Sequence, residues 1–166
     1  EVEVPLTIFA ASTWYAAEGS KSTLIGSCRW CDRDTDGRDT LNPVDNFVRS
    51  ALKWDDIDAA DTWSNVSAAG AGAAAFGELA LVEIADNAAA RFPSDALMVM
   101  EAVTFAGAAN GVVKLGAARE RPFVHVLAPD DKLRTKDASD NNASFYSGHA
   151  SFTFSIAAAS AMVATL

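Results

Sequence analysis

The sequence predicts an all-α protein built as a helical bundle. Half of its 166 residues are apolar, Ala is the commonest of them, and runs of β-branched residues are few. Apolar residues recur at helical spacing at Val44, Phe47, Val48, Ala51 and Leu52. A chain of this length is one domain's worth and can bury a core.

The expected helices follow from breaks along the chain. An apolar segment over 4–17 ends at a turn signal at 18–20. A second helix covers 43–54, and 55–61 is an acidic connection. An Ala- and Gly-rich helix from about 62 to 90 can approach its neighbours closely. Residues 91–94 break it, with Ser94 or Asp95 capping a helix from 96 to about 120. The uncharged segment 150–166 is either a buried central helix or a membrane span.

Charge and cysteine content limit the function classes. The net charge of −9 argues against a nucleic-acid partner, because a phosphate backbone requires a basic face. The only cysteines, Cys28 and Cys31, are compatible with a structural disulfide, plain thiols, a redox pair or half a zinc site. Zinc is least favoured, because further ligands are not nearby. Residues 32–39 resemble the start of a calcium-binding loop, but Pro43 replaces its last acidic ligand, which favours a solvated turn.

Two cations and a Ser-Gly-His turn give the strongest functional signal. Lys114 and Arg121 lie seven residues apart, two turns along one face of the expected helix, so both can converge on one small anion. Ser147, Gly148 and His149 precede the uncharged final segment. Ser147 stands near the expected N-cap, where free N–H groups can bind an anion. With an imidazole as acid/base group, these residues describe a phosphate pocket.

This pattern resembles the type 2 phosphatidic acid phosphatase (PAP2) superfamily, which also contains bacterial acid phosphatases and vanadium-dependent haloperoxidases. Its first motif, Lys-x6-Arg-Pro, matches residues 114–122, and its second, Ser-Gly-His, matches residues 147–149. The flanking residues 119–120 and 144–145 match as well. Tyr146 departs from the pattern, since the family usually has Pro there. The resemblance implies a helical bundle of the PAP2/haloperoxidase type.

The resemblance also implies a role for each motif residue. Lys114 and Arg121 would bind phosphate oxygens, Ser147 and Gly148 would donate hydrogen bonds, and His149 would protonate the leaving oxygen. The implied reaction is hydrolysis of phosphomonoesters or diphosphates, those of lipids included, through a phosphohistidine intermediate. The nucleophile belongs to a third motif, Ser-Arg-x5-His-x3-Asp, which the sequence does not contain. We therefore expect residues 1–166 to be a single PAP2-like domain, the N-terminal part of a longer protein truncated before that motif.

No metal or other cofactor is expected, although vanadate can mimic phosphate in the pocket. The expected partners are a phosphorylated small molecule or lipid and a membrane. Glu78, Glu83 and the short apolar stretch between Glu101 and Lys114 argue for packing in solution. The Ala/Gly-rich helices and the uncharged last segment argue for a membrane bundle. We favour the membrane or periplasm of a bacterial cell envelope, with the site on the non-cytoplasmic side.

Other interpretations stay open. A vanadate-dependent haloperoxidase would use the same pocket, and a non-catalytic phosphate- or lipid-binding or structural membrane subunit would not need the third motif. Asn110 shares the face of Lys114 and either lines the pocket or bonds a neighbouring helix. The loop 123–142 is a candidate lid, or else a solvated surface loop in which His125 is an ordinary surface or packed histidine.

Overall fold

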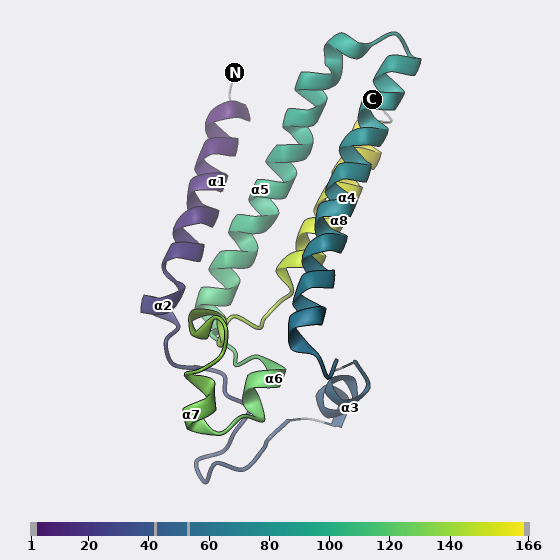
Figure 1. The fold of residues 1–166 in the computed structure, drawn as a ribbon. Coiled ribbons are helices and arrows are strands. Elements are labelled where there is room, and N and C mark those ends of the chain that lie inside the picture. The colour runs from purple at the N-terminus through teal and green to yellow at the C-terminus, as the bar shows by residue number, and fades with distance from the viewer. Residues whose placement is uncertain (1–2, 42, 53, 165–166) are drawn as a thin grey trace.

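The computed structural model describes residues 3–41, 43–52 and 54–164 and shows a bundle of four long helices (Figure 1). These are α1 (Glu3–Gly19), α4 (Ile57–Ala85), α5 (Phe92–Ala117) and α8 (Gly148–Val163). The short helices are α2 (Lys21–Leu24), α3 (Pro43–Leu52), η1 (Ala89–Arg91), α6 (Pro122–His125), α7 (Pro129–Lys132) and η2 (Ala138–Asp140). The described ranges hold no β-strand, only two isolated bridges, which confirms the all-α prediction.

The long helices pack in the order α1, α5, α8, α4. Helix α5 contacts α1 on one side and α8 on the other, and α8 also packs on α4. The main core lies among α4, α5 and α8 and contains Leu79, Val99, Val103, Ile156 and Val163. The helices α2, α3, α6 and α7 gather at one end of this bundle, and the α4–α5 connection lies at the other (Figure 1).

A second, smaller core lies among the loops at the end of the bundle that carries the short helices. It brings together Ile25, Ala118 and Ala143, each at most 2% exposed, with Leu115 packed against them. These residues come from three segments that are distant in the sequence. Their burial fixes the chain after α2, the end of α5 and the chain before α8 relative to one another.

Helix α4 begins earlier than the sequence predicted. We expected an acidic connection over 55–61, and this is wrong from Ile57 onwards. The Asp56 carboxylate accepts a hydrogen bond from the Ala59 N–H at 2.9 Å, and Asp58 lies in the first turn. Both acids therefore favour a helix N-terminus, because they satisfy or attract its free N–H groups.

Helix α5 also begins earlier, at Phe92 instead of residue 96. Neither Ser94 nor Asp95 is its cap: the N-cap residue is Arg91, and no side chain caps the helix there. Pro93 is accommodated in the first turn, where its missing N–H would have no partner in any case. The break that we predicted at 91–94 is therefore only the junction of η1 and α5.

Two described segments are long and apolar enough to cross a membrane, Ile57–Ala85 and Ala89–Ala117. Taken alone, length and composition are weak evidence, since the core helix of a soluble protein passes the same test. The long helices also expose large side chains to the outside, among them Phe9, Trp63 and Phe154, which are 61–78% exposed. The long helices thus carry large apolar side chains on their outer surfaces as well as in the core.

The α1–α5 contact depends on close backbone approach and gives a first prediction. A Cβ on Gly107 would lie 2.6 Å from Trp14 Cδ2, whereas a Cβ on Gly77 would meet nothing within 4 Å. The free energy of unfolding of Gly107→Ala should therefore be about 1–3 kcal/mol lower than that of Gly77→Ala. Both variants gain helix propensity, but only Gly107→Ala introduces the clash. Thermal unfolding followed by circular dichroism measures both variants. Equal stability would show that α1 does not pack on α5 at this distance.

Candidate active site

The first motif is divided between the end of α5 and the loop that follows it. Lys114 lies in the last turn of α5, and its side chain is buried. Ala118 then adopts a left-handed conformation with φ of 41°, which ends the helix. Arg121 has extended dihedral angles and precedes α6. Our prediction that Lys114 and Arg121 lie two turns apart on one helical face is therefore wrong, because the helix ends at Ala117 and not at about Glu120.

The loop segment 118–121 is instead held by hydrogen bonds on both sides. On one side, the Arg29 N–H donates to the Ala118 carbonyl at 3.0 Å, and the Glu120 N–H donates to the Trp30 carbonyl at 3.1 Å. These bonds satisfy main-chain groups that lie outside any helix. The chain after α2 thus pairs, backbone to backbone, with one side of the segment that carries Arg121.

On the other side, the segment 118–121 binds the chain that leads to the second motif. The Arg121 N–H donates to the Asn141 carbonyl at 2.8 Å, and the Ser144 N–H donates to the Arg119 carbonyl at 3.1 Å. The backbone of the first motif is therefore hydrogen-bonded to the backbone of the chain that leads into the second motif. These hydrogen bonds, and not a shared helical face, set the position of Arg121 relative to α8.

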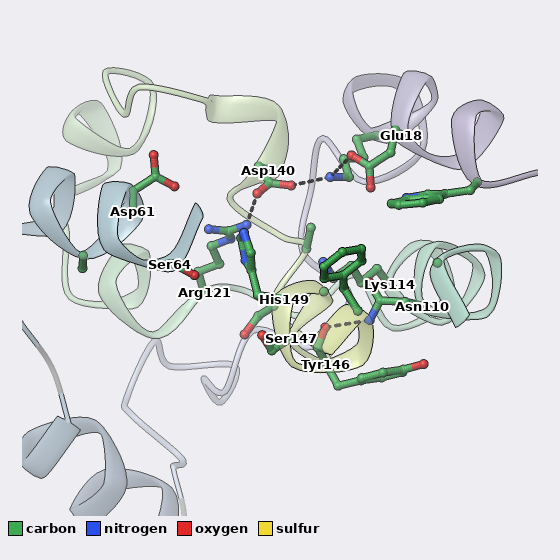
Figure 2. Close-up of a pocket in the computed structure, with 18 of the residues that line it drawn as sticks. Glu18, Asp61, Ser64, Asn110, Lys114, Arg121, Asp140, Tyr146, Ser147 and His149 are labelled. Carbon is green, nitrogen blue, oxygen red and sulfur yellow. Dashed lines mark hydrogen bonds and ion pairs between the residues drawn. The ribbon is translucent and has the colours of Figure 1, made fainter. Parts of the chain in front are cut away.

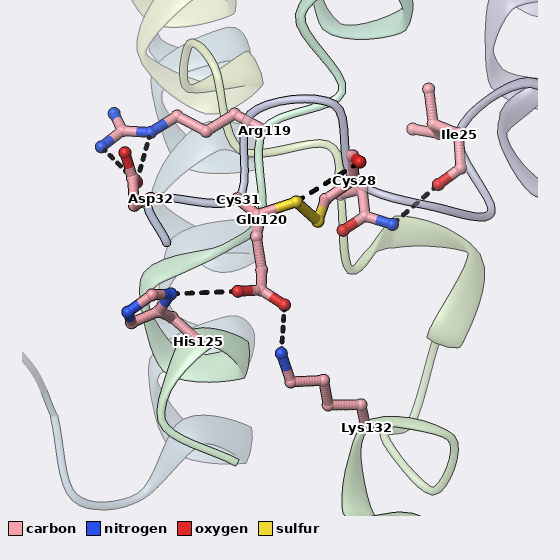
Figure 3. The surroundings of a disulfide bond; sticks show 9 residues. Ile25, Cys28, Cys31, Asp32, Arg119, Glu120, His125 and Lys132 are labelled. Atoms are coloured by element: carbon pink, nitrogen blue, oxygen red, sulfur yellow. Dashed lines mark hydrogen bonds and ion pairs between the residues drawn. A yellow bond between two sulfur atoms is a disulfide. The ribbon is translucent and has the colours of Figure 1, made fainter. Parts of the chain in front are cut away.

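A disulfide closes the loop on the first side (Figure 3). Cys28 and Cys31 are bonded, with their Cα atoms 5.5 Å apart, so the structure selects the disulfide among the alternatives that the sequence left open. Within this loop, the Arg29 guanidinium donates to the carbonyls of Leu115 at 2.8 Å and Gly116 at 3.2 Å. A cation that binds the free carbonyls of a helix C-terminus stabilises it. The disulfide loop therefore caps α5 immediately after Lys114.

The two residues before Arg121 have structural partners (Figure 3). Arg119 pairs with Asp32, with its Nη2 atom 2.9 Å from the carboxylate. The buried Glu120 carboxylate pairs with Lys132 and accepts from the ring of His125, whose Nδ1 lies 3.0 Å away. His125, which we expected to be a surface or packed histidine, is thus buried and packed. Glu120 therefore holds the loop 123–142 against the first motif.

The second motif begins α8 as the sequence predicted. Ser147 is the N-cap residue, and its hydroxyl accepts from the Ala150 N–H at 3.3 Å. The preceding turn is held from α5, because the Asn110 amide donates to the Tyr146 carbonyl at 2.9 Å. Asn110 also lines the pocket described below, as one of its two expected roles required, whereas its hydrogen bond goes to the turn before α8 and not to a neighbouring helix. Tyr146, the residue that departs from the PAP2 pattern, contributes its backbone oxygen to this contact.

Gly148 lets the two motifs touch. A Cβ at this position would lie 3.3 Å from Lys114 Nζ and 3.4 Å from Asn110 Oδ1. Any larger residue would crowd the lysine, so the absence of a side chain allows the ammonium group to reach the first turn of α8. The positive end of that helix and a lysine thus face the same space.

All five predicted site residues line one pocket of about 980 Å³ (Figure 2). They are Lys114, Arg121, Ser147, Gly148 and His149. Their roles stay predictions, but the structure brings them together at the end of the bundle that carries the short helices. Among the described residues, no group of three His, Cys, Asp or Glu side chains is placed to hold a metal ion.

Three charged residues that the sequence did not single out complete the pocket. Asp140 forms an ion pair with Arg121 through one carboxylate oxygen and binds Lys21 Nζ at 2.8 Å through the other. Lys21 also pairs with Glu18 at the end of α1 (Figure 2). Asp140 was visible only as one acid among several in a loop, and Lys21 carried no signal because it lies almost a hundred residues before the first motif.

The pocket contains both signs of charge. Lys21, Lys114 and Arg121 face the carboxylates of Glu18, Asp61 and Asp140. Burial lowers the pKa of the Arg121 guanidinium, and nearby carboxylates, with Asp137 the largest contributor, oppose that shift. The guanidinium stays charged at neutral pH. The cations and carboxylates named here therefore balance one another, so the pocket is not simply cationic.

The imidazole of His149 contacts α4. Its Nε2 atom lies 2.9 Å from the side-chain oxygen of Asn65. Asn65 follows Ser64 directly and comes one turn after Asp61, and both of those residues line the pocket. No sequence pattern marks Asn65, since α4 carries neither motif.

The chain is thus an all-α protein in which residues of two separate motifs line one pocket together with charged side chains of both signs. Residues 95–165 match the family model described as the PAP2 superfamily. This match confirms the resemblance and supports membership of the chain in that superfamily, whose members are generally phosphatases. No curated protein and no solved structure matches the chain.

The pairing of Asp140 with two cations gives a second prediction. Asp140→Asn removes the charge that both Lys21 and Arg121 bind while it keeps the side chain's shape. The Asp140 side chain is 19% exposed, so we expect a loss of about 1–3 kcal/mol in the free energy of unfolding, below the range for fully buried pairs.

The matched control is Asp36→Asn, because the Asp36 side chain is 69% exposed and its ion pair with Arg38 is long, at 3.9 Å. Its effect should stay within about 0.5 kcal/mol. Urea denaturation measures both variants. If Asp140→Asn were as stable as the control, the ion pairs would not hold the loop onto α2.

Proposed function

We propose that this pocket binds the phosphoryl group of a phosphomonoester or diphosphate and that the protein hydrolyses it through a phosphohistidine intermediate. The observation that carries the proposal is the meeting of Lys114 with the first turn of α8, beside Arg121. A lysine, an arginine and free backbone N–H groups are the donors that proteins use to hold phosphate. The match to the PAP2 superfamily supports the same reaction class.

Each site residue has one task in this proposal. Lys114 and Arg121 bind the equatorial oxygens of the transferring group, and they stabilise the charge that spreads over these oxygens in the transition state. Ser147 and the Gly148 N–H add hydrogen bonds from the start of α8. His149 gives a proton to the leaving oxygen. The nucleophile is the histidine of the family's third motif, which is not among residues 1–166.

Arg121 can serve both the protein and the ligand. A guanidinium has five N–H donors, and Asp140 engages it through Nη2. The remaining edge is available to a phosphate, whose oxygens match its planar geometry. In this arrangement Asp140 holds the guanidinium in place while the substrate binds it.

The pocket also has room for more than a phosphate. Its walls include Trp14 and Tyr15 of α1, Ile57 of α4 and Phe152 of α8, which are apolar over most of their surface. A volume of about 980 Å³ is in the range of pockets that hold drug-sized ligands. We propose that the leaving group has an apolar part that contacts these walls, as in a phosphorylated lipid or a hydrophobic phosphate ester.

The proposed location is supported by two features of the described chain. Two segments are apolar and long enough to cross a membrane, and the Cys28–Cys31 disulfide lies against the first motif. Disulfides persist in oxidising compartments. We therefore propose association with the membrane of a cell envelope, such as that of a bacterium, with the pocket on the non-cytoplasmic side.

Loss of the Arg121 side chain should weaken anion binding. We expect Arg121→Ala to lower the affinity for inorganic phosphate and for vanadate by about 10- to 100-fold, because charge-assisted hydrogen bonds contribute about 1.5–3 kcal/mol. Isothermal titration calorimetry measures the affinity. Arg38→Ala is the control, since its side chain is 79% exposed and lies outside the pocket. Equal affinities in the two variants would show that Arg121 does not bind the anion.

If His149 is the general acid, its loss should affect two kinds of substrate differently. In the full-length protein, His149→Ala should slow hydrolysis of an alkyl phosphate about 100-fold or more, because an alkoxide leaves poorly without a proton. Hydrolysis of p-nitrophenyl phosphate should fall much less, since p-nitrophenolate departs readily as an anion. Steady-state kinetics on both substrates measures the effect.

Equal losses on both substrates would contradict the acid role. Bromide oxidation that appears only with added vanadate would instead favour a haloperoxidase. Phosphate binding without any turnover by the full-length protein would favour a non-catalytic binding subunit.

A further inference from the structure

The contact between His149 and Asn65 links the second motif to a helix that carries neither motif. His149 lies in the first turn of α8, and its Nε2 atom is 2.9 Å from Asn65 Oδ1 on α4. Helices α4 and α8 pack against each other, so Asn65 is placed by the bundle and not by the loops. The bond joins an imidazole on the pocket to a neutral amide on a rigid element.

The chemistry of the two groups fixes where the proton lies. An amide oxygen accepts hydrogen bonds and does not donate them, so Nε2 must be the donor. In the neutral ring the single N–H is then on Nε2, and Nδ1 carries the lone pair. A second proton can add only at Nδ1.

We propose that Asn65 is a positioning residue that orients the ring of His149 and keeps a proton on Nε2, so that Nδ1 takes up and delivers the catalytic proton. When the P–O ester bond breaks, the phosphoryl group bonds to the nucleophilic histidine of the third motif. The Nδ1–H bond of the His149 imidazolium breaks in the same step, and an O–H bond forms on the leaving oxygen. The ring returns to its neutral Nε2–H form and stays bonded to Asn65. The catalytic part of this inference rests on the proposed function, whereas the hydrogen bond and the tautomer do not.

A neutral partner suits a group that must release its proton. A carboxylate at the same place would favour the imidazolium and hold its proton more firmly. An amide orients the ring without adding charge to a pocket that already holds Glu18, Asp61 and Asp140 beside Lys21, Lys114 and Arg121. Asn65 thus gives the His149 ring a fixed direction and adds no charge beside it.

The histidine content of the chain makes a direct test practical. Residues 1–166 contain two histidines, His149 and His125, so long-range ¹H–¹⁵N correlation spectra of their imidazole nitrogens are simple to assign. A protein that also contains the third motif adds the ring of the proposed nucleophile. His149→Gln identifies the signals of His149 by their loss. His125, whose Nδ1 bonds Glu120, serves as an internal control that the Asn65 variants should leave unchanged.

Three variants separate positioning from other roles. Asn65→Asp has only acceptor atoms, so it should keep the Nε2–H tautomer of the wild type. Asn65→Ala removes the acceptor, so the share of the Nδ1–H tautomer and the mobility of the ring should both rise. Ser67→Ala, on the same helix and exposed, should match the wild type.

Two results would overturn the inference. One is an Asn65→Ala spectrum with the tautomer ratio and ring mobility of the wild type. The other is a wild-type ring, or an Asn65→Asp ring, with its proton mainly on Nδ1, because the amide would then face His149 through its NH₂ group. The spectra require no turnover, so they test the inference about Asn65 independently of the proposed function. The proposed function is tested by the kinetic comparison of two substrates.

Discussion

The site depends on one constraint, the backbone pairing of the segment 118–121. This segment hydrogen-bonds to residues 29–30 on one side and to residues 141–144 on the other. A loop that carries a phosphate-binding arginine would otherwise be free to move, and its main-chain groups would need water as partners. The pairing converts the loop into a fixed element, and the small core of Ile25, Ala118 and Ala143 buries its first residue.

The same constraint explains how three consecutive charged residues acquire different tasks. Arg119 pairs with Asp32 on the disulfide side, and Glu120 pairs with Lys132 and contacts the buried His125. Arg121 alone lines the pocket among these three. The first two therefore assemble the loops, and that assembly places the third beside the start of α8. The disulfide supports this assembly indirectly, because the loop that it closes carries Arg29, which caps α5 after Lys114.

Much of the fold could be read from the sequence, because helix content and caps are local properties. The all-α class and the N-cap role of Ser147 are such cases. The starts of α4 and α5 were missed because an acidic cluster and a proline look like breaks, although both are favourable in a first helical turn. These errors concern a few residues at helix ends, but the early start of α4 matters to the site, because it places Ile57 and Asp61 on the pocket.

The two motifs of the candidate site were predictable from the sequence, but their geometry and the other charged residues of the pocket were not. We expected Lys114 and Arg121 to meet because they share a helical face, whereas they meet because a left-handed Ala118 ends the helix and loop pairing brings Arg121 back. Lys21 and Asn65 lie in segments distant from both motifs, and no local pattern marks them. Contacts of this kind arise only from tertiary packing, so a single sequence does not show them.

The central claim is that this end of the bundle holds a phosphate-like anion. A crystal structure of the protein soaked with vanadate tests it most directly. The account predicts a single oxyanion within hydrogen-bond distance of Lys114 Nζ, the Arg121 guanidinium and the main-chain N–H groups that begin α8. An oxyanion bound elsewhere on the molecule, with this pocket empty and Arg121 bonded only to Asp140, would contradict it.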